Sequence, residues 1–158
     1  MTGLAPALLR SLGQCAGREN VLTDASDCWP YGYDNSRRPQ SPDAVVFATA
    51  HEQVLEIVRL CNSHDTPITA RGRGTGTSGG SVPLRAGIVL SLERMNRIVS
   101  MDAANRAMTV EPGVINLDAQ NVAGQSGLFW PPDPTSNAFC SVGGNLALNA
   151  AGPRAVKY

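Results

Sequence analysis

The sequence has almost no lysine and no closely spaced pair of cysteines, and each absence excludes a class of site. Twelve of the 13 basic residues are arginine, and the single lysine is Lys157. No glycine-rich segment therefore carries the lysine that a P-loop needs to bind nucleotide phosphates. The four cysteines include no C-x-x-C pair, which argues against a zinc or iron–sulfur site and against a disulfide-rich scaffold. We predict no metal site, and we expect free, buried thiols.

The sequence also lacks a net charge and a long apolar stretch. Its 13 basic and 13 acidic residues balance, so the chain has no general attraction for nucleic acid or for an anionic membrane. No stretch reaches the length of a transmembrane helix, and the first residues do not resemble a signal peptide. Apolar residues make up 42% of the 158 residues, which suits an ordered domain with its own core. We expect a cytoplasmic protein, with peripheral attachment to a membrane as the alternative.

Glycine, by contrast, is concentrated in one segment, Arg71–Gly80, which reads RGRGTGTSGG. Glycine tolerates positive φ and lets backbone N–H groups approach a ligand closely. Successive N–H groups in such a segment form a concave anion site, to which Arg73 and the hydroxyl groups can add donors. A flexible surface loop is the alternative. The two arginines and the apolar runs on either side favour a diphosphate-binding loop.

The same segment matches the G-x-G-x-x-G pattern of Rossmann folds between Gly74 and Gly79. That fingerprint must open a helix, whose N-terminus receives the pyrophosphate. Here the glycines are followed by Pro83 and by a strand-like apolar run. Because no helix fits between them, we interpret the match as a false indication of NAD binding.

The first half of the chain predicts a β–α–β unit. Thr49 and Glu52 have the spacing of a capping box, which begins a helix that ends near Ser63. Short apolar runs before and after this helix are typical of strands covered on both faces. We expect a right-handed crossover between parallel strands. The predicted strands are Ala44–Ala48, Ile68–Ala70 and Ile88–Leu92, and the last of these joins the same sheet.

The residues before Ala44 predict a lead-in to this unit. The apolar spacing of Leu4–Leu12 predicts an amphipathic helix that Gly13 stops. Residues 21–42 are rich in proline, aromatic and charged residues, and we expect an irregular segment that packs its aromatics on the domain.

The second half of the chain predicts an antiparallel hairpin followed by helices. Arg97–Met101 and Arg106–Glu111 alternate as two strands joined by a turn. Asn116 is expected to cap a helix that runs to about Ser126 and stops at Gly127. The fold class is therefore α+β. Two further segments are the rigid proline-rich run Pro131–Ser136 and a small-residue helix, Leu146–Ala151, entered through Val142–Asn145.

Three of these segments, in this order, resemble one known domain: Arg71–Gly80, Pro132–Ser136 and Val142–Asn149. The ordered set is similar to the FAD-binding PCMH-type domain of the vanillyl-alcohol-oxidase/p-cresol-methylhydroxylase superfamily. Within it, the sequence most resembles the branch of the glycolate oxidase subunit GlcD and D-lactate dehydrogenase. The resemblance implies a small βαβ lobe followed by an incomplete antiparallel-sheet lobe. It also implies that residues 44–158 are the N-terminal part of the FAD-binding domain and that residues 1–43 lead into it.

The resemblance implies FAD as the cofactor. Some relatives tether the flavin through a histidine in the glycine loop, and Thr75 stands at the corresponding position here, which implies non-covalent binding. In the family the glycine loop surrounds the diphosphate, while the proline-rich segment and the Gly-Gly-Asn helix start line the flavin. The residues implied in cofactor binding are Arg71, Gly72, Arg73, Gly74, Thr75, Gly76, Thr77, Ser78, Pro132, Asp133, Ser136, Gly143, Gly144, Asn145 and Asn149.

The resemblance further implies a flavin-dependent oxidoreductase that oxidises a 2-hydroxy acid such as glycolate or D-lactate, with other oxidase subunits or an electron acceptor as partners. The family's catalytic residues and substrate-binding cap lie beyond the region matched, so we predict no catalytic residue here. We expect an N-terminal fragment that is inactive alone and binds FAD weakly. A non-catalytic flavin- or nucleotide-binding module is the alternative. So is another flavoenzyme on the same domain, such as an alditol oxidase or a cell-wall-precursor reductase.

Overall fold

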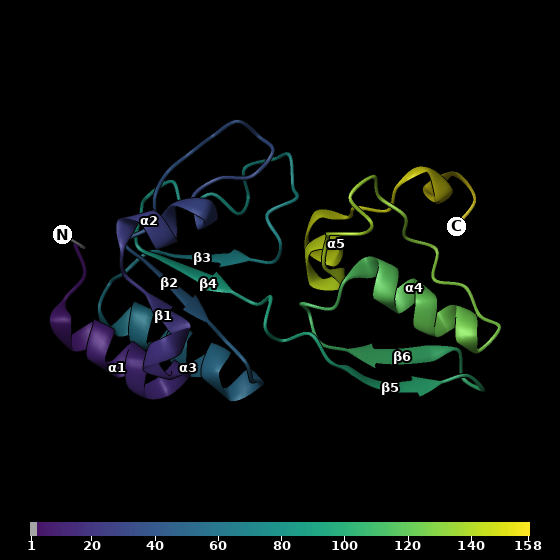
Figure 1. The fold of residues 1–158 in the computed structure, drawn as a ribbon, viewed down its shortest axis with the longest axis horizontal. Helices are drawn as coiled ribbons and strands as arrows, with labels where there is room; N and C mark the ends of the chain where they lie inside the picture. Colours follow the sequence, from purple (N-terminus) through teal and green to yellow (C-terminus); the bar gives the residue numbers. More distant parts are fainter. Residues whose placement is uncertain (1–2) are drawn as a thin grey trace. The chain divides into compact units, whose positions relative to one another are not determined.

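The computed structural model describes residues 3–158 and is shown in Figure 1. The chain divides into two compact units, with the boundary between Arg94 and Met95. Helices and small, open sheets occur in both units, so the expected α+β class is confirmed. In the described part of the chain, no helix is long and apolar enough to cross a membrane.

The first unit is built on a four-stranded sheet with the order β1-β2-β4-β3. Both β2 and β3 pair with β4 in parallel, and β1 pairs with β2 antiparallel. The expected parallel strands are therefore confirmed, and β4 lies between the other two. The strands are β1 (Val21–Leu22), β2 (Ala44–Phe47), β3 (Ile68–Arg71) and β4 (Ile88–Ser91).

Helices cover this sheet on both faces. In Figure 1, α1 (Pro6–Ala16) and α3 (His51–Ser63) lie on one side and the short α2 (Ala25–Cys28) lies on the other. Every residue of β2 and β4 is buried, which explains why these segments are continuous apolar runs instead of alternating ones. On the α2 side the core consists of Cys28, Val45, Phe47 and Val89, with Leu22 and Tyr31 packed against it.

Two predictions for the first unit are wrong: the end of the first helix and the irregular character of residues 21–42. Helix α1 continues through Gly13 to Ala16, which is 3% exposed, and it ends at Gly17, whose φ of 91° suits glycine. Burial of Ala16 therefore places the stop at the second of two available glycines. The predicted irregular segment 21–42 is also more ordered than expected, because it contains β1, α2 and a 3₁₀ turn, Trp29–Tyr31.

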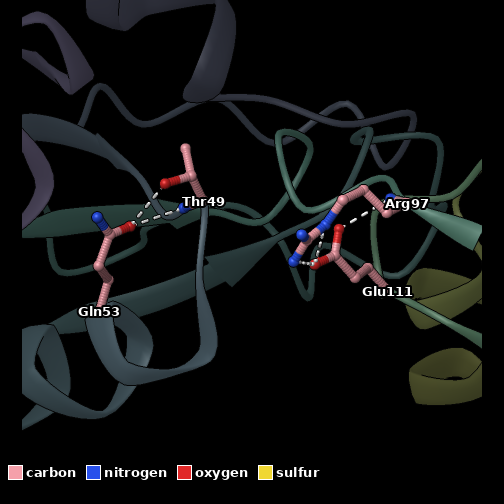
Figure 2. Close-up of polar contacts among 4 residues, drawn as sticks. All are labelled: Thr49, Gln53, Arg97 and Glu111. Atoms are coloured by element: carbon pink, nitrogen blue, oxygen red, sulfur yellow. Dashed lines mark hydrogen bonds and ion pairs between the residues drawn. The ribbon is translucent and has the colours of Figure 1, made fainter. Parts of the chain in front are cut away.

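The predicted capping box at α3 does not form. The N-cap residue is Ala50. The amide and hydroxyl of Thr49 instead donate to Gln53 Oε1 over 2.8 and 3.1 Å (Figure 2). Glu52 is exposed. The glutamine four residues after Thr49 thus takes the place that the box assigned to Glu52.

The second unit consists of a hairpin with helix α4 packed on it. Strands β5 (Ile98–Asp102) and β6 (Ala107–Val110) pair antiparallel, which confirms the predicted hairpin. At its open end, the Glu111 carboxylate accepts three hydrogen bonds from Arg97 (Figure 2). The core contains Val114, Ala119 and Val142, with Ile98, Met108, Val110 and Trp130 packed against it.

The helices of this unit differ in detail from the prediction. Helix α4 (Asn116–Gln125) has Ile115 as its N-cap, so Asn116 is a helical residue and not the predicted cap. Helix α5 (Val142–Leu148) begins earlier than expected and ends before Asn149, whose φ is 50°. A 3₁₀ turn, Pro153–Val156, follows. The glycines expected to precede α5 therefore form its first turn.

Candidate functional site

The glycine loop leaves β3 at Arg71 and returns to the sheet at β4. Two of its carbonyl groups are anchored by Asn35: the Asn35 amide donates to the Gly76 carbonyl over 2.9 Å, and Asn35 Nδ2 donates to the Thr75 carbonyl over 3.2 Å. Its amides are not. From Gly72 to Ser78, no backbone N–H has an acceptor within the described residues 3–158. A run of consecutive open amides is the arrangement that binds anions.

A buried carboxylate holds the far end of this loop. Asp34 is 7% exposed. It accepts hydrogen bonds from the Gly79 amide at 3.0 Å, from the Ser36 amide at 2.8 Å and from the Ser81 hydroxyl at 3.4 Å. Burial alone would raise the pKa of Asp34, but the hydrogen bonds from Ser36, Gly79 and Ser81 hold that pKa below its ordinary value. Asp34 is therefore an anion that the fold stabilises.

Arg71 lies inside the unit at the start of the loop. Its guanidinium donates to the Pro30 carbonyl over 3.2 Å and to the Ser81 hydroxyl over 3.4 Å, and it lies 5.7 Å from the centre of the Tyr31 ring. Burial lowers the pKa of Arg71, while the nearby carboxylate of Asp34 raises it. An arginine remains charged under these conditions. The loop consequently has a fixed positive charge close to its open amides.

Other predicted loop residues are more accessible. Arg73 is exposed and pairs with Glu93 at 3.6 Å. Glu93 also accepts a hydrogen bond from the Tyr31 hydroxyl at 3.3 Å. Thr77 and Ser78 are exposed, so their hydroxyls are available to a ligand. The predicted diphosphate residues thus combine one buried cation with an open backbone and exposed donors.

The remaining predicted residues lie in the second unit, around the side chain of Asn116, which is 0% exposed. Asn116 Nδ2 donates to the Pro132 carbonyl over 2.9 Å and to Asn137 Oδ1 over 3.1 Å. Asn116 Oδ1 accepts from Trp130 Nε1 at 2.9 Å and from Asn145 Nδ2 at 3.1 Å. This amide therefore joins the proline-rich segment to the first turn of α5.

Asp133 fixes the proline-rich segment on its other side. Its carboxylate accepts from Asn137 Nδ2 at 2.8 Å and pairs with Arg154 at 3.2 Å. Its backbone amide donates to the Ala151 carbonyl over 2.9 Å. Gly152, with a φ of 75°, lies against the Asp133 carbonyl, and a side chain there would overlap it. The contacts of Asp133 therefore hold the proline-rich segment against the C-terminal residues Ala151–Arg154.

The two glycines of α5 make different contacts. The Gly143 amide donates to the Pro112 carbonyl over 2.9 Å, and a Cβ at this position would lie 2.7 Å from Pro112 Cβ. The Gly144 amide donates to the hydroxyl of Ser141, the helix N-cap, over 3.3 Å. The first glycine thus permits close packing, and the second is part of a capped helix start. Ser136 is half-buried and Asn149 is exposed.

The residues that hold both groups of predicted site residues in place were not predicted from the sequence. Asp34 and Asn35 anchor the glycine loop from about 40 positions away. Asn116 had been predicted as a cap. In its network, Gln120 Nε2 donates to the Pro132 carbonyl over 2.9 Å, and Asn137 Nδ2 donates to Gln120 Oε1 over 3.1 Å. A polar residue inside an otherwise helical pattern was the one available signal for Asn116 and Gln120.

All four cysteines are free, and three of them are buried as expected, whereas Cys15 is partly exposed. Across residues 3–158, no group of histidine, cysteine and acidic residues is placed to hold a metal ion.

The comparisons with known proteins identify the class of domain. The model of the family described as "FAD binding domain" matches residues 42–158. The chain therefore belongs to the FAD binding domain family, and FAD as the predicted cofactor is confirmed. The open amides of the glycine loop and its buried cation fit the diphosphate of that cofactor.

Most of the chain also aligns with parts of two longer enzymes. It is 39% identical over 146 residues to glycolate oxidase subunit GlcD of Bacillus subtilis, covering 92% of this chain and 31% of the relative. It is 43% identical over 117 residues to D-lactate dehydrogenase of Anaerostipes hadrus, covering 74% of this chain and 24% of that relative. The chain thus spans about a third or less of the length of these relatives.

Solved structures confirm the fold. Alkyldihydroxyacetonephosphate synthase matches with a TM-score of 0.88 at 22% identity, covering 98% of this chain and 34% of the other. p-Cresol methylhydroxylase matches with a TM-score of 0.76 at 27% identity, covering 91% of this chain and 30% of the other. The predicted resemblance to the PCMH-type FAD-binding fold is therefore confirmed.

Proposed function

We propose that the glycine loop binds the diphosphate of FAD and that the chain is the FAD-binding portion of an oxidoreductase acting on a 2-hydroxy acid. The observation that carries the first part is the run of open amides from Gly72 to Ser78. Three features surround it: anchored carbonyls at Thr75 and Gly76, the buried charge of Arg71, and exposed hydroxyls. Each favours an anion over a neutral ligand.

The second unit is proposed to contact the flavin. Its candidate residues belong to two segments that Asn116 and Asn145 hold together through hydrogen bonds. Rigid segments of this kind preserve the orientation of a bound ring, which is the contribution that a protein makes to flavin chemistry. The proposed residues are Pro132, Asp133, Ser136, Gly143, Gly144, Asn145 and Asn149.

FAD, when bound, supplies the hydride-accepting chemistry of such an enzyme. We propose non-covalent binding because the position that resembles the tethering histidine is Thr75, which has no imidazole nitrogen to form that link. Arg71 and Arg73 are proposed to offset the charge of the diphosphate, Arg71 from inside the unit and Arg73 from its exposed position. The substrate-contacting residues are proposed to lie outside the segments described here.

The proposed substrate class comes from the names of the relatives. Glycolate oxidase, D-lactate dehydrogenase and the D-2-hydroxyglutarate dehydrogenase of Stutzerimonas stutzeri, which is 34% identical over 154 residues, are all named for 2-hydroxy acids. A phenol is the second candidate, since the 4-ethylphenol oxidase of Gulosibacter chungangensis is 28% identical in sequence. The greater identity of the first group favours the 2-hydroxy acid.

Two measurements test the proposal. FAD titration by fluorescence quenching is expected to show saturable binding that inorganic pyrophosphate weakens in competition, because both ligands use the glycine loop. Binding that riboflavin competes for and pyrophosphate does not would contradict the diphosphate assignment. Activity is then assayed on the gene product with an artificial electron acceptor, comparing glycolate, D-lactate and 4-ethylphenol. Turnover of the phenol alone would overturn the proposed substrate class.

A further inference from the structure

We propose that Asp34 is a positioning residue for the FAD diphosphate, one that shapes the glycine loop before the cofactor binds. The inference rests on the proposed function of that loop. It concerns a short segment, Asp34–Ser36, which we call the strap. The strap belongs to none of the three segments that carry the resemblance, yet it contacts the glycine loop at several points.

The strap uses both oxygens of the Asp34 carboxylate. Oδ1 accepts from the Ser36 amide at 2.8 Å, which fixes the turn of the strap itself. Oδ2 accepts from the Gly79 amide at 3.0 Å and from the Ser81 hydroxyl at 3.4 Å. Because hydrogen bonds to a buried charge are stronger than neutral ones, this carboxylate is a firm anchor for the end of the loop.

Ser81 connects the anchor to the start of the loop. Its hydroxyl donates to Asp34 and accepts from Arg71 Nη1, each over 3.4 Å. Arg71 is the last residue of β3, and Gly79 lies eight positions further along the chain. One partly buried chain of contacts, from Arg71 through Ser81 to Asp34 and Gly79, therefore holds the two ends of the loop at fixed positions.

The middle of the loop is held by the next residue of the strap. Asn35 donates to the carbonyls of Thr75 and Gly76. Carbonyl oxygens near a diphosphate would repel its negative charge, so an arrangement that occupies them on the strap side favours anion binding. The strap thus contacts two carbonyl groups in the middle of the loop and the Gly79 amide at its end. It leaves the amides from Gly72 to Ser78 open.

The charge of Asp34 also matters for Arg71. The Arg71 guanidinium is buried, and the Asp34 carboxylate is the first of the groups that offset the effect of burial on its pKa. An asparagine at position 34 would remove that charge. Its amide nitrogen would also face either Gly79 or Ser36, whose backbone N–H groups are both donors, so one of these hydrogen bonds would be lost. Asp34→Asn is therefore a small change with a specific expected effect.

The chain supplies a matched control in Asp43. Its carboxylate accepts from the Gly87 amide at 2.9 Å, and Gly87 has a φ of 71°, close to the 82° of Gly79. Asp43 thus makes the same kind of contact in the same unit, at a turn outside the stretch of open amides. Asp34→Asn, Asp34→Ala, Asn35→Ala and Asp43→Ala form the set to compare.

The experiment measures the shape of the loop and cofactor binding separately. Limited digestion with trypsin, followed by mass spectrometry, gives the rate of cleavage after Arg73 in the absence of FAD. Cleavage after Arg106, an exposed residue of the β5–β6 turn, is the internal reference. The dissociation constant of FAD is measured by fluorescence quenching, and circular-dichroism melting checks that each variant is folded.

We expect Asp34→Ala to raise the Arg73 cleavage rate and the FAD dissociation constant by about tenfold or more. Asp34→Asn and Asn35→Ala should show the same changes to a smaller extent. Asp43→Ala should leave both quantities unchanged even where its melting temperature falls, which separates positioning from general stability. Should Asp34→Ala fail to fold, Asp34→Asn and Asn35→Ala, the latter at an exposed position, provide the same comparison.

The outcomes separate this inference from the proposed function. Wild-type affinity for FAD in both Asp34 variants would overturn the inference and leave the diphosphate site standing. Absence of FAD binding by the wild-type chain would overturn the proposed site. In that case, an unchanged cleavage rate after Arg73 in Asp34→Ala would overturn the shaping of the loop as well.

Discussion

The backbone of Gly74 lies directly against the guanidinium of Arg71. Gly74 has a φ of 67°, and a Cβ built on it would overlap Arg71 Nη2. Arg71 cannot easily yield, because its nitrogens are bound to the Pro30 carbonyl and the Ser81 hydroxyl. The buried cation and the glycine above it therefore depend on each other.

Gly74→Ala is expected to weaken FAD binding strongly, since the added methyl group meets both a disfavoured φ and the Arg71 side chain. We expect a loss of about 2 kcal/mol in folding free energy as well, measurable by urea denaturation. Gly124→Ala is the control, because nothing lies within 4 Å of its added Cβ and it should stabilise α4 by up to about 1 kcal/mol. Undiminished FAD affinity in Gly74→Ala would contradict the assignment of the loop.

Asn116→Ala is expected to destabilise the second unit by about 3 kcal/mol. The substitution leaves Trp130 Nε1 and Asn145 Nδ2 without their acceptor in a buried environment. Urea denaturation followed by tryptophan emission measures the effect. Asn121→Ala, at an exposed position of the same helix, should change stability by less than about 0.5 kcal/mol. Equal effects of the two substitutions would show that Asn116 is not the centre of the network.

The hairpin is expected to loosen in acid. The hydrogen bonds from Arg97 hold the pKa of Glu111 below its ordinary value of 4.5. A carboxylate whose pKa is lowered by folding stabilises the folded state at every pH above its pKa in the unfolded chain. That contribution is lost as the pH falls through its pKa in the folded protein. Thermal melts between pH 6 and about pH 2 should therefore show a decline that is smaller in Glu111→Gln. Parallel curves for the two proteins would contradict this role.

Flavin is expected to dissociate fully from the denatured protein. Because Thr75 offers no tethering imidazole, acid precipitation of the FAD-loaded protein should leave all flavin absorbance in the supernatant. A flavoprotein with a covalent link, treated in parallel, provides the control for pelleted flavin. Yellow colour retained in the washed pellet of this protein would refute non-covalent binding.

The sequence was sufficient to predict the buried strands. In β2 and β4 every side chain is covered, so the local composition carries the whole signal. The helix α3 was predicted, but its capping interaction was not, because Thr49 donates to Gln53 and the sequence pattern for a capping box names Glu52. Local patterns therefore gave the elements correctly and their boundaries less well.

The candidate site could be predicted where it depends on the residue composition of one segment. It could not be predicted where it depends on contacts between residues far apart in the sequence. A glycine-rich segment indicates open amides by itself. The position of Arg71 depends on Pro30, 41 residues away in the chain, and the anchoring of Gly79 depends on Asp34, 45 residues away. No local pattern records such pairings, so the residues that shape the loop became visible only in the folded structure.

The position of β4 determines when the loop can form. β4 pairs with both β2 and β3, although it follows both of them in the chain. During synthesis, β3 therefore lacks its native partner strand until β4 has emerged from the ribosome. The glycine loop is the connection between β3 and β4, so the insertion of β4 completes the sheet and brings the ends of the loop together in one event. A nascent chain that stops short of β4 would consequently lack a closed cofactor loop. Its unpaired strands would be prone to aggregation.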